Sequence, residues 1–201
     1  MLPMNLYKKG VIMERLVTYF EKPGRENTEK CVDIVEKELE RGVYKNLVVA
    51  STTGETGLLF AKRLRDKDVN LVVITHCYGF KEPNTMEMPD NVRDELKSYG
   101  AKVFTGTMIT HSLETSLSSK FSGLYPTLIV AQSLRRLGEG LKVCCEIVMM
   151  AADSGLIPEG EVVLAVAGTA RGADTVCTIR SAVSKRFLEL KVLEILAKPR
   201  V

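Results

Sequence analysis

The sequence contains no tryptophan and only two histidines, and none of its cysteines forms a Cys-x-x-Cys pair. With so few imidazoles and no paired thiols, the usual spacing of a zinc site cannot be assembled. No stretch approaches the roughly 20 apolar residues of a membrane-spanning helix. The net charge is only +3, without the clustered basic face of a dedicated nucleic-acid binder. We therefore expect a cytoplasmic protein with reduced thiols, no bound metal, and neither nucleic acid nor membrane as a partner.

The length predicts a single domain. The chain has 201 residues, of which 45% are hydrophobic and 26% are charged, as in an ordinary globular protein. We place the domain over residues 13–201 and interpret residues 1–12 as an N-terminal extension, because Met13 stands just before the first strand-like run. The extension lacks the long apolar core of a signal peptide. Met13 is therefore a candidate native start.

Short apolar strands alternate with amphipathic helices at intervals of about 25–30 residues, which is the spacing of βαβ units. The predicted strands cover residues 16–20, 46–50, 71–75, 101–105, 161–167, 175–180 and 192–196. The predicted helices run from Asn27 or Thr28 to Gly42, over 57–64, from near Pro89 to Tyr99, and over 113–120, 126–137 and 141–153. Continuous apolar strands are typical of a parallel sheet covered on both faces. The pattern therefore predicts an α/β fold.

A hydroxyl-rich turn follows the strand 46–50. It reads STTGET over residues 51–56, so four hydroxyl groups, one glycine and the free N–H groups of a helix start fall together. Such N–H groups carry partial positive charge and bind phosphate. The alternative is an ordinary helix cap with Thr53 as the N-cap residue. The turn is not a Walker loop, because it lacks the Gly-Lys-Ser/Thr ending.

A second glycine-containing loop, GTARGADT over residues 168–175, follows the strand 161–167. Its glycines let the backbone approach a ligand, and the guanidinium of Arg171 suits phosphate or carboxylate. The alternative is a β-turn in which Arg171 lies in solvent or pairs with Asp174.

These loops belong to a larger set that we expect at one edge of the sheet. The segments that follow predicted strands are 21–28, 51–56, 76–80, 105–108 and 168–174. Because ligands of open α/β sheets bind beyond the carboxyl ends of the strands, the five segments predict a single crevice. Within it, Tyr78 is the better candidate to stack on a ligand ring and Phe80 the weaker one. His76 either contacts a ligand or bonds locally.

Glu146 is the one charged residue in the run VCCEIVMMAA, residues 143–152. A helix that is apolar all round is buried, and a buried carboxylate must be paired or protonated. Glu146 therefore either bonds a ligand or forms a structural pair with an arginine or with loop N–H groups.

Several motifs resemble known proteins. VASTTGET (49–56) and AVAGTARGADTVCTIR (165–180) resemble the C-terminal α/β domain of pyruvate kinase. KPGRENT (22–28), THCYGF (75–80), GLKVCCEI (140–147) and MAADSG (150–155) are similar to a small stand-alone family built on that domain. The second resemblance extends over nearly the whole chain from about Met13. It implies a three-layer α/β/α sandwich on a mostly parallel sheet with one antiparallel strand.

The resemblance also implies a ligand. Stand-alone members resemble binders of flavin mononucleotide (FMN), whose phosphate would lie on residues 51–56; failing FMN, another phosphorylated metabolite takes its place. Glu55 departs from the small or basic residues of the pyruvate kinase loop and favours a monophosphate. The implied ligand-binding residues are Lys22, Gly24, Asn27, Ser51, Thr52, Thr53, Gly54, Glu55, Thr56, His76, Tyr78, Gly79, Phe80, Thr105, Gly106, Glu146, Gly168, Thr169, Arg171, Gly172, Asp174 and Thr175.

Three functional hypotheses follow. The first is a binding protein for a phosphorylated small molecule, with FMN foremost. The second is a flavin-dependent oxidoreductase, in which the cofactor supplies the chemistry, since no nucleophile–base pair stands out in the sequence. The third is a regulatory, effector-binding module of a partner enzyme. Pyruvate kinase activity is not expected, because its active site lies in a barrel of more than about 200 residues. Assembly into a homo-oligomer is expected.

Overall fold

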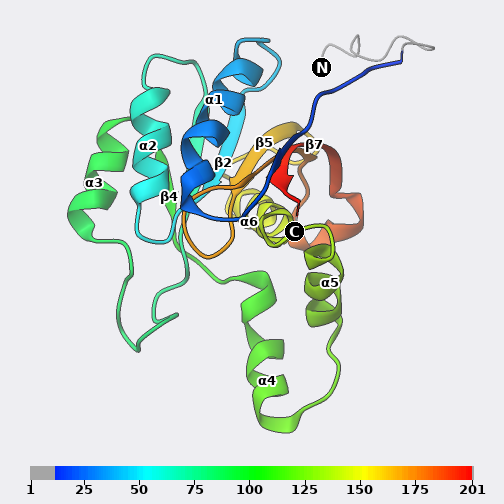
Figure 1. The fold of residues 1–201 in the computed structure, drawn as a ribbon. Coiled ribbons are helices and arrows are strands. Elements are labelled where there is room, and N and C mark those ends of the chain that lie inside the picture. The colour runs from blue at the N-terminus through cyan, green and yellow to red at the C-terminus, as the bar shows by residue number, and fades with distance from the viewer. Residues whose placement is uncertain (1–11, 201) are drawn as a thin grey trace.

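The computed structural model describes residues 12–200, and a seven-stranded sheet forms their centre (Figure 1). The strands are β1 (Thr18–Phe20), β2 (Asn46–Ala50), β3 (Asn70–Ile74), β4 (Lys102–Phe104), β5 (Val162–Ala167), β6 (Thr175–Arg180) and β7 (Lys191–Pro199). Their order in the sheet is β1-β7-β6-β5-β2-β3-β4. β6 is antiparallel to both neighbours, and the other pairs in this sheet are parallel. The predicted mostly parallel sheet with one antiparallel strand is confirmed.

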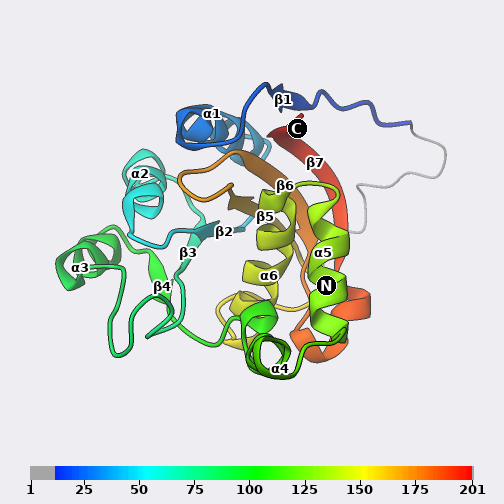
Figure 2. The ribbon, with the colours of Figure 1, turned by 60° about the horizontal axis from the view of Figure 1, so that its bottom comes forward.

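Helices cover both faces of the sheet, which completes the three expected layers (Figure 2). They are α1 (Thr28–Leu39), α2 (Glu55–Arg63), α3 (Asp90–Ser98), α4 (Leu113–Phe121), α5 (Pro126–Arg135) and α6 (Glu139–Asp153). The first three lie on one face, and α6 lies on the other beside α5. Successive side chains of a strand point to opposite faces. Accordingly, Leu47 and Val49 of β2 join the core under α1 and α2, while Val48 joins the core under α6.

α6 is the central helix of its layer. From Gly140 to Ala152 every residue of α6 except Val143 is buried. Gly140 allows the close approach to β6, because a Cβ atom there would lie 2.1 Å from the Oγ1 atom of Thr175. The helix is therefore packed on all sides, and its polar side chains must find partners inside the protein.

The cysteines are free thiols, and most of them are buried. Burial raises the pKa of Cys31 and of Cys145 to about 12. Burial, and next its neighbour Cys177, also hold the pKa of Cys144 well above its ordinary value. Since the thiolate is the reactive form, these cysteines are inert packing residues at neutral pH.

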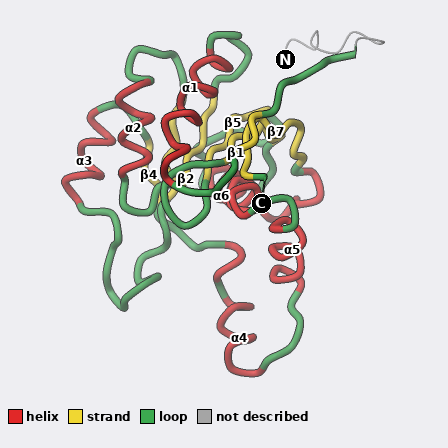
Figure 3. The backbone as a smooth tube through the Cα atoms, viewed as in Figure 1, coloured by secondary structure: helices red, strands yellow, loops and turns green. Residues whose placement is uncertain are grey.

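The connection from β4 to α6 forms a helical arm that projects from the sheet (Figures 1 and 3). Its helix α4 and the loop after it leave large apolar side chains exposed, namely Leu113, Leu117, Phe121 and Leu124. Exposed apolar surface of this kind often marks an interaction site. The expected homo-oligomer stays a prediction.

The structure differs from the sequence-based expectation mainly at element ends. α6 begins at Glu139, two residues early, because Gly138 at φ +139° already ends the connection from α5. Three short 3-10 helices were not predicted, namely Arg25–Asn27, Ile109–His111 and Ser184–Glu189. Apart from Ile12, the expected extension 1–12 lies outside the described residues. Among the helices of residues 12–200, none is long and apolar enough to cross a membrane.

Candidate functional site

A cavity of about 570 Å³ opens at the carboxyl ends of β2, β3 and β5. Its walls are the turn after β2, the residues after β3, the loop after β5 and one side of α6. This is the edge at which open α/β sheets bind ligands. Half of the predicted site residues line it, namely Ser51, Thr52, Thr53, Glu55, Thr56, His76, Phe80, Glu146, Gly168, Arg171 and Gly172.

The other predicted site residues do not line this cavity, although several shape the loops around it. They are Lys22, Gly24, Asn27, Gly54, Tyr78, Gly79, Thr105, Gly106, Thr169, Asp174 and Thr175. Asn27 illustrates such a role, because its side-chain amide donates to the carbonyl oxygens of Lys22 and Gly24 at 2.8 and 3.2 Å. A cavity is therefore present where the crevice was predicted, but fewer of the predicted residues line it.

The turn after β2 carries N–H groups that no protein atom accepts. Among the described residues, the N–H groups of Thr52 through Thr56 have no hydrogen-bond partner, whereas that of Gly57 donates to Ser51 Oγ at 3.0 Å. α2 begins directly after Gly54, which holds the N-cap position at φ +93° without side-chain capping. The alternative of a Thr53 cap is therefore wrong. A row of free N–H groups at a helix start can bind an anion.

Asp174 holds the loop after β5 in shape. It is fully buried, and its Oδ2 atom accepts the N–H groups of Thr169 and Gly24 at 3.0 and 3.1 Å. Its Oδ1 atom accepts the hydroxyl of Thr175 at 2.8 Å. The alternative in which Asp174 pairs with Arg171 is therefore wrong. Arg171 is exposed at the cavity and has no ion pair within residues 12–200, so its guanidinium is available to an anionic ligand.

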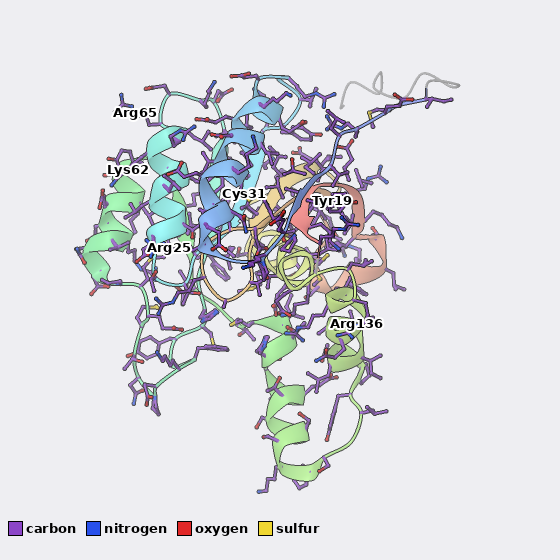
Figure 4. All side chains as sticks on the ribbon, in the orientation of Figure 1. Tyr19, Arg25, Cys31, Lys62, Arg65 and Arg136 are labelled. Atoms are coloured by element: carbon purple, nitrogen blue, oxygen red, sulfur yellow. The ribbon has the colours of Figure 1, made fainter. Side chains whose placement is uncertain are left out.

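The loop 168–174 rests against the start of α1. The N–H group of Ala173 donates to Thr28 Oγ1 at 2.9 Å, and a Cβ atom on Gly172 would lie 2.5 Å from the Cα atom of Arg25. Arg25 also forms an ion pair with Glu55 at 3.4 Å, and Figure 4 shows it near the lower ends of α1 and α2. One edge of the cavity is therefore formed by three segments that are distant in the sequence, namely the start of α1, the start of α2 and the loop 168–174.

Glu146 is paired with a residue that the sequence analysis missed. Lys142, one turn earlier on α6, places its Nζ atom 2.5 Å from Glu146 Oε2, and the two side chains are only 1% and 3% exposed. Glu146 Oε1 accepts the N–H group and the hydroxyl of Thr110 at 2.8 and 2.7 Å. Burial acts to raise the pKa of Glu146, but Lys142 and Thr110 outweigh it and hold that pKa below its ordinary value. Of the two alternatives for Glu146, the structure shows the structural pair, with one N–H group, that of Thr110, and with a lysine in place of the arginine.

Phe80, not Tyr78, is the aromatic residue at the cavity. The ring centroid of Phe80 lies 4.2 Å from that of His76 and 5.8 Å from that of His111. Tyr78 points elsewhere, since its hydroxyl donates to the carbonyl oxygen of Asn84 at 2.6 Å. The sequence-based preference between the two is therefore reversed, because the irregular loop after β3 gives no periodic signal for side-chain direction.

Several cavity residues were not predicted. Arg135 and Glu139 line the wall as an ion pair at 2.8 Å. Arg135 ends α5 and Glu139 begins α6, so no helical spacing in the sequence indicates this pair. Both also border a neighbouring cavity of about 410 Å³ with the basic residues Arg136, Lys198 and Arg200. Arg136 directly follows α5, and Figure 4 labels it there. Among residues 12–200, no three His, Cys, Asp or Glu residues are grouped to hold a metal ion.

Stability should fall as the solution is acidified below about pH 6.5. Burial, and next the charge of Lys142, lower the pKa of His111 from its ordinary 6.5, so the unfolded chain takes up this proton first and gains stability relative to the folded one. Glu146, whose pKa is also lowered, causes a second loss of stability below its ordinary pKa of 4.5. Urea unfolding at pH 7, 6 and 5 measures the loss of stability that His111 causes. His111→Gln should flatten the curve between pH 7 and 5 and leave the steeper fall below pH 4.5. An unchanged slope in that variant would contradict the assignment.

One comparison with known proteins agrees with this architecture. The family model described as "Pyruvate kinase, alpha/beta domain" matches residues 29–180, which include β2 through β6 and both cavity loops. Among solved structures, this chain is similar to a crystal structure of O-ureido-L-serine synthase at 14% sequence identity, with a TM-score of 0.30. That match covers 68% of this chain and 42% of the synthase. At such a TM-score the second likeness carries no argument about function.

Proposed function

The chain belongs to the pyruvate kinase alpha/beta domain family, and on that premise we propose that it binds a phosphorylated small molecule, FMN foremost, in the cavity at the carboxyl ends of the strands. The family match supports an effector-binding or regulatory α/β module. The observation that carries the proposal is the combination of free N–H groups and an unpaired arginine on one cavity. Both features are donors without a protein acceptor, and a phosphate group supplies acceptors in that geometry.

The charges around the cavity favour one anionic group at the turn 51–56. Of the lining lysine and arginine side chains within residues 12–200, Lys142 is paired with Glu146 and Arg135 with Glu139. Arg171 alone has no carboxylate partner. Glu55 lies on the same rim, although Arg25 partly neutralises it. A monophosphate therefore fits this end of the cavity better than a bisphosphate does.

The cavity also has an apolar wall on which the flat face of a ring system would lie. Its wall beyond the turn includes Ile74, Met108, Val143, Ile147 and Met150, together with the Phe80 ring. A volume of about 570 Å³ lies within the range of roughly 300–1,000 Å³ of small-molecule pockets. With its isoalloxazine ring on this wall and its ribityl phosphate on residues 51–56, one FMN molecule would contact both the apolar wall and the free N–H groups.

The proposal predicts that the phosphate group strengthens binding. Wild-type protein should quench FMN fluorescence on binding and should bind riboflavin, which has the same ring without phosphate, at least about 10-fold more weakly. Arg171→Gln should weaken FMN binding by about 10- to 100-fold, because a hydrogen bond to a charged group contributes roughly 1.5–3 kcal/mol. Since Arg171 is exposed and unpaired, the fold should be unchanged.

Arg180→Gln is the matched control. Arg180 is also exposed and without an ion pair among the described residues, but it lies at the far end of β6, so the variant should bind FMN normally. Equal affinity for FMN and riboflavin, or equal loss in both variants, would contradict the phosphate site. If neither flavin binds but another phosphomonoester raises the melting temperature, the coarser proposal stands and FMN is excluded.

A further inference from the structure

Three polar side chains at the cavity form a continuous hydrogen-bonded series. The Nε2 atom of His76 lies 3.3 Å from the Oγ1 atom of Thr52, and its Nδ1 atom lies 2.7 Å from Glu87 Oε2. All three residues line the cavity. The side chains of His76 and Glu87 remain 34% and 22% exposed, so water could satisfy them and the fold does not require the series. Hydroxyl, imidazole and carboxylate in this order are the arrangement of an activated nucleophile.

The surroundings of His76 define its tautomer and orientation. A carboxylate only accepts hydrogen bonds, so the proton of the neutral imidazole lies on Nδ1, which donates a hydrogen bond to Glu87. Nε2 then holds the lone pair and accepts the hydroxyl proton of Thr52. The ring of Phe80 lies against the imidazole at 4.2 Å between centroids. His76 is thus held from one end and from one face, as a general base must be.

Thr52 also occupies a position suited to a nucleophile. It stands in the sharp turn between β2 and α2, flanked by small residues in the pattern Ala50-Ser51-Thr52-Thr53-Gly54. Enzymes with a nucleophile elbow place a serine in the same strand–turn–helix context between small residues. The free N–H groups of Thr53 through Thr56 follow directly, and donors at this place stabilise the oxyanion of an acyl-transfer intermediate.

We propose that Thr52, His76 and Glu87 form a nucleophilic relay that hydrolyses a small carboxylic ester in this cavity. Thr52 Oγ1 attacks the ester carbonyl as its proton passes to His76 Nε2, the C–O bond to the leaving alcohol breaks, and His76 returns the proton to that alcohol. Water, deprotonated by His76, then cleaves the Thr52 ester and releases the acid and the free hydroxyl. Thr52 and His76 are the catalytic residues. Glu87, whose carboxylate accepts the hydrogen bond of His76 Nδ1, acts through the imidazole and is a positioning residue. This inference does not depend on FMN binding.

Turnover of p-nitrophenyl acetate tests the relay. We expect release of nitrophenolate above the buffer rate and an acetyl group on Thr52, located by peptide mass spectrometry after acid quench. Thr52→Val and His76→Gln should each lose about 1,000-fold or fall to background. Thr52→Ser should restore turnover. Glu87→Gln should lower kcat by about 10- to 100-fold with little change in KM, because it disturbs the base and not the binding of the ester.

Thr107→Val is the matched control, because Thr107 is an exposed threonine outside the cavity lining; its rate should equal that of wild type. Circular dichroism and melting curves establish that each variant is folded. Cys77 is a partly buried free thiol next to His76. An acetyl group on Cys77 instead of Thr52, or an undiminished rate in folded Thr52→Val, would overturn the proposal. The two proposals can fail independently. FMN binding without ester turnover contradicts only the relay. Ester turnover without FMN binding contradicts only the proposal that the cavity binds FMN.

Discussion

Replacing Lys142 with methionine should lower the free energy of unfolding by about 3–5 kcal/mol. The variant leaves the carboxylate of Glu146 without its 2.5 Å partner in a site where that side chain is 3% exposed. Thr110 still donates two hydrogen bonds to Glu146, and His111 Nδ1 lies 4.0 Å from Glu146 Oε1. Because burial lowers the pKa of His111, this imidazole does not replace the lost positive charge at pH 7. The measurement is urea unfolding at pH 7 followed by circular dichroism.

Two controls separate burial of charge from loss of packing. The double variant Lys142→Met/Glu146→Gln should regain most of the lost stability, because no buried charge remains and the glutamine oxygen still accepts from Thr110. Arg135→Met breaks a pair of the same i, i+4 spacing that is 22% and 37% exposed, and should cost about 1 kcal/mol or less. If the double variant is as unstable as Lys142→Met, packing of the lysine chain explains the loss and the ion-pair account is wrong.

Gly172→Ala should destabilise the protein and weaken ligand binding together. Gly172 has φ +73°, and an added Cβ atom would lie 2.5 Å from the Cα atom of Arg25 and 2.6 Å from Thr28 Oγ1. Backbone cannot yield as a flexible side chain does, so the loop 168–174 must move away from α1. Such overpacking costs roughly 1–3 kcal/mol beyond the strain of a positive φ, and Arg171 is displaced with the loop.

Gly160→Ala separates the effect of backbone strain at a positive φ from the effect of the steric clash with α1. Gly160 has a similar φ of +82°, but no atom lies within 4 Å of the position of an added Cβ. Its substitution should therefore cost only about 1–2 kcal/mol and leave FMN binding unchanged. Melting temperature and FMN titration of both variants provide the comparison. Equal effects of the two substitutions would mean that the loop does not depend on its contact with the start of α1.

The fold could be predicted from the sequence because its signals are local and repeated. The strand 46–50 matches β2 residue for residue, since an unbroken apolar run between polar turns is short enough for a strand and too short for a buried helix. The predicted strand 175–180 likewise matches β6 residue for residue. The βαβ spacing also predicts helices packed on a parallel sheet, because parallel strands need helices to cross over, whereas the three layers and the antiparallel strand are implied by the resemblance to the pyruvate kinase domain.

The chemistry of the site was less accessible, because it depends on contacts without periodicity. Lys142 stands at the start of a helix and resembles an ordinary solvated charge; only the packing of α6 on all sides shows it as the partner of Glu146. Glu87 lies in the irregular connection between β3 and α3, where nothing in the sequence indicates that it folds back onto His76. Such pairings are properties of the assembled loops and not of any segment.

The ties between the two ends of the chain also imply an order of events in time. Gly24 is hydrogen-bonded to Asp174 across 150 residues, and Thr28 to Ala173 across 145. Because closing such long loops costs conformational entropy, these contacts form only when most other contacts already exist. On a ribosome, the residues that will support the loop 168–174 emerge long before the loop itself is synthesised. We therefore expect the sheet around β2 and β3 to form early and the capacity to bind ligand to arise in the final stage of folding.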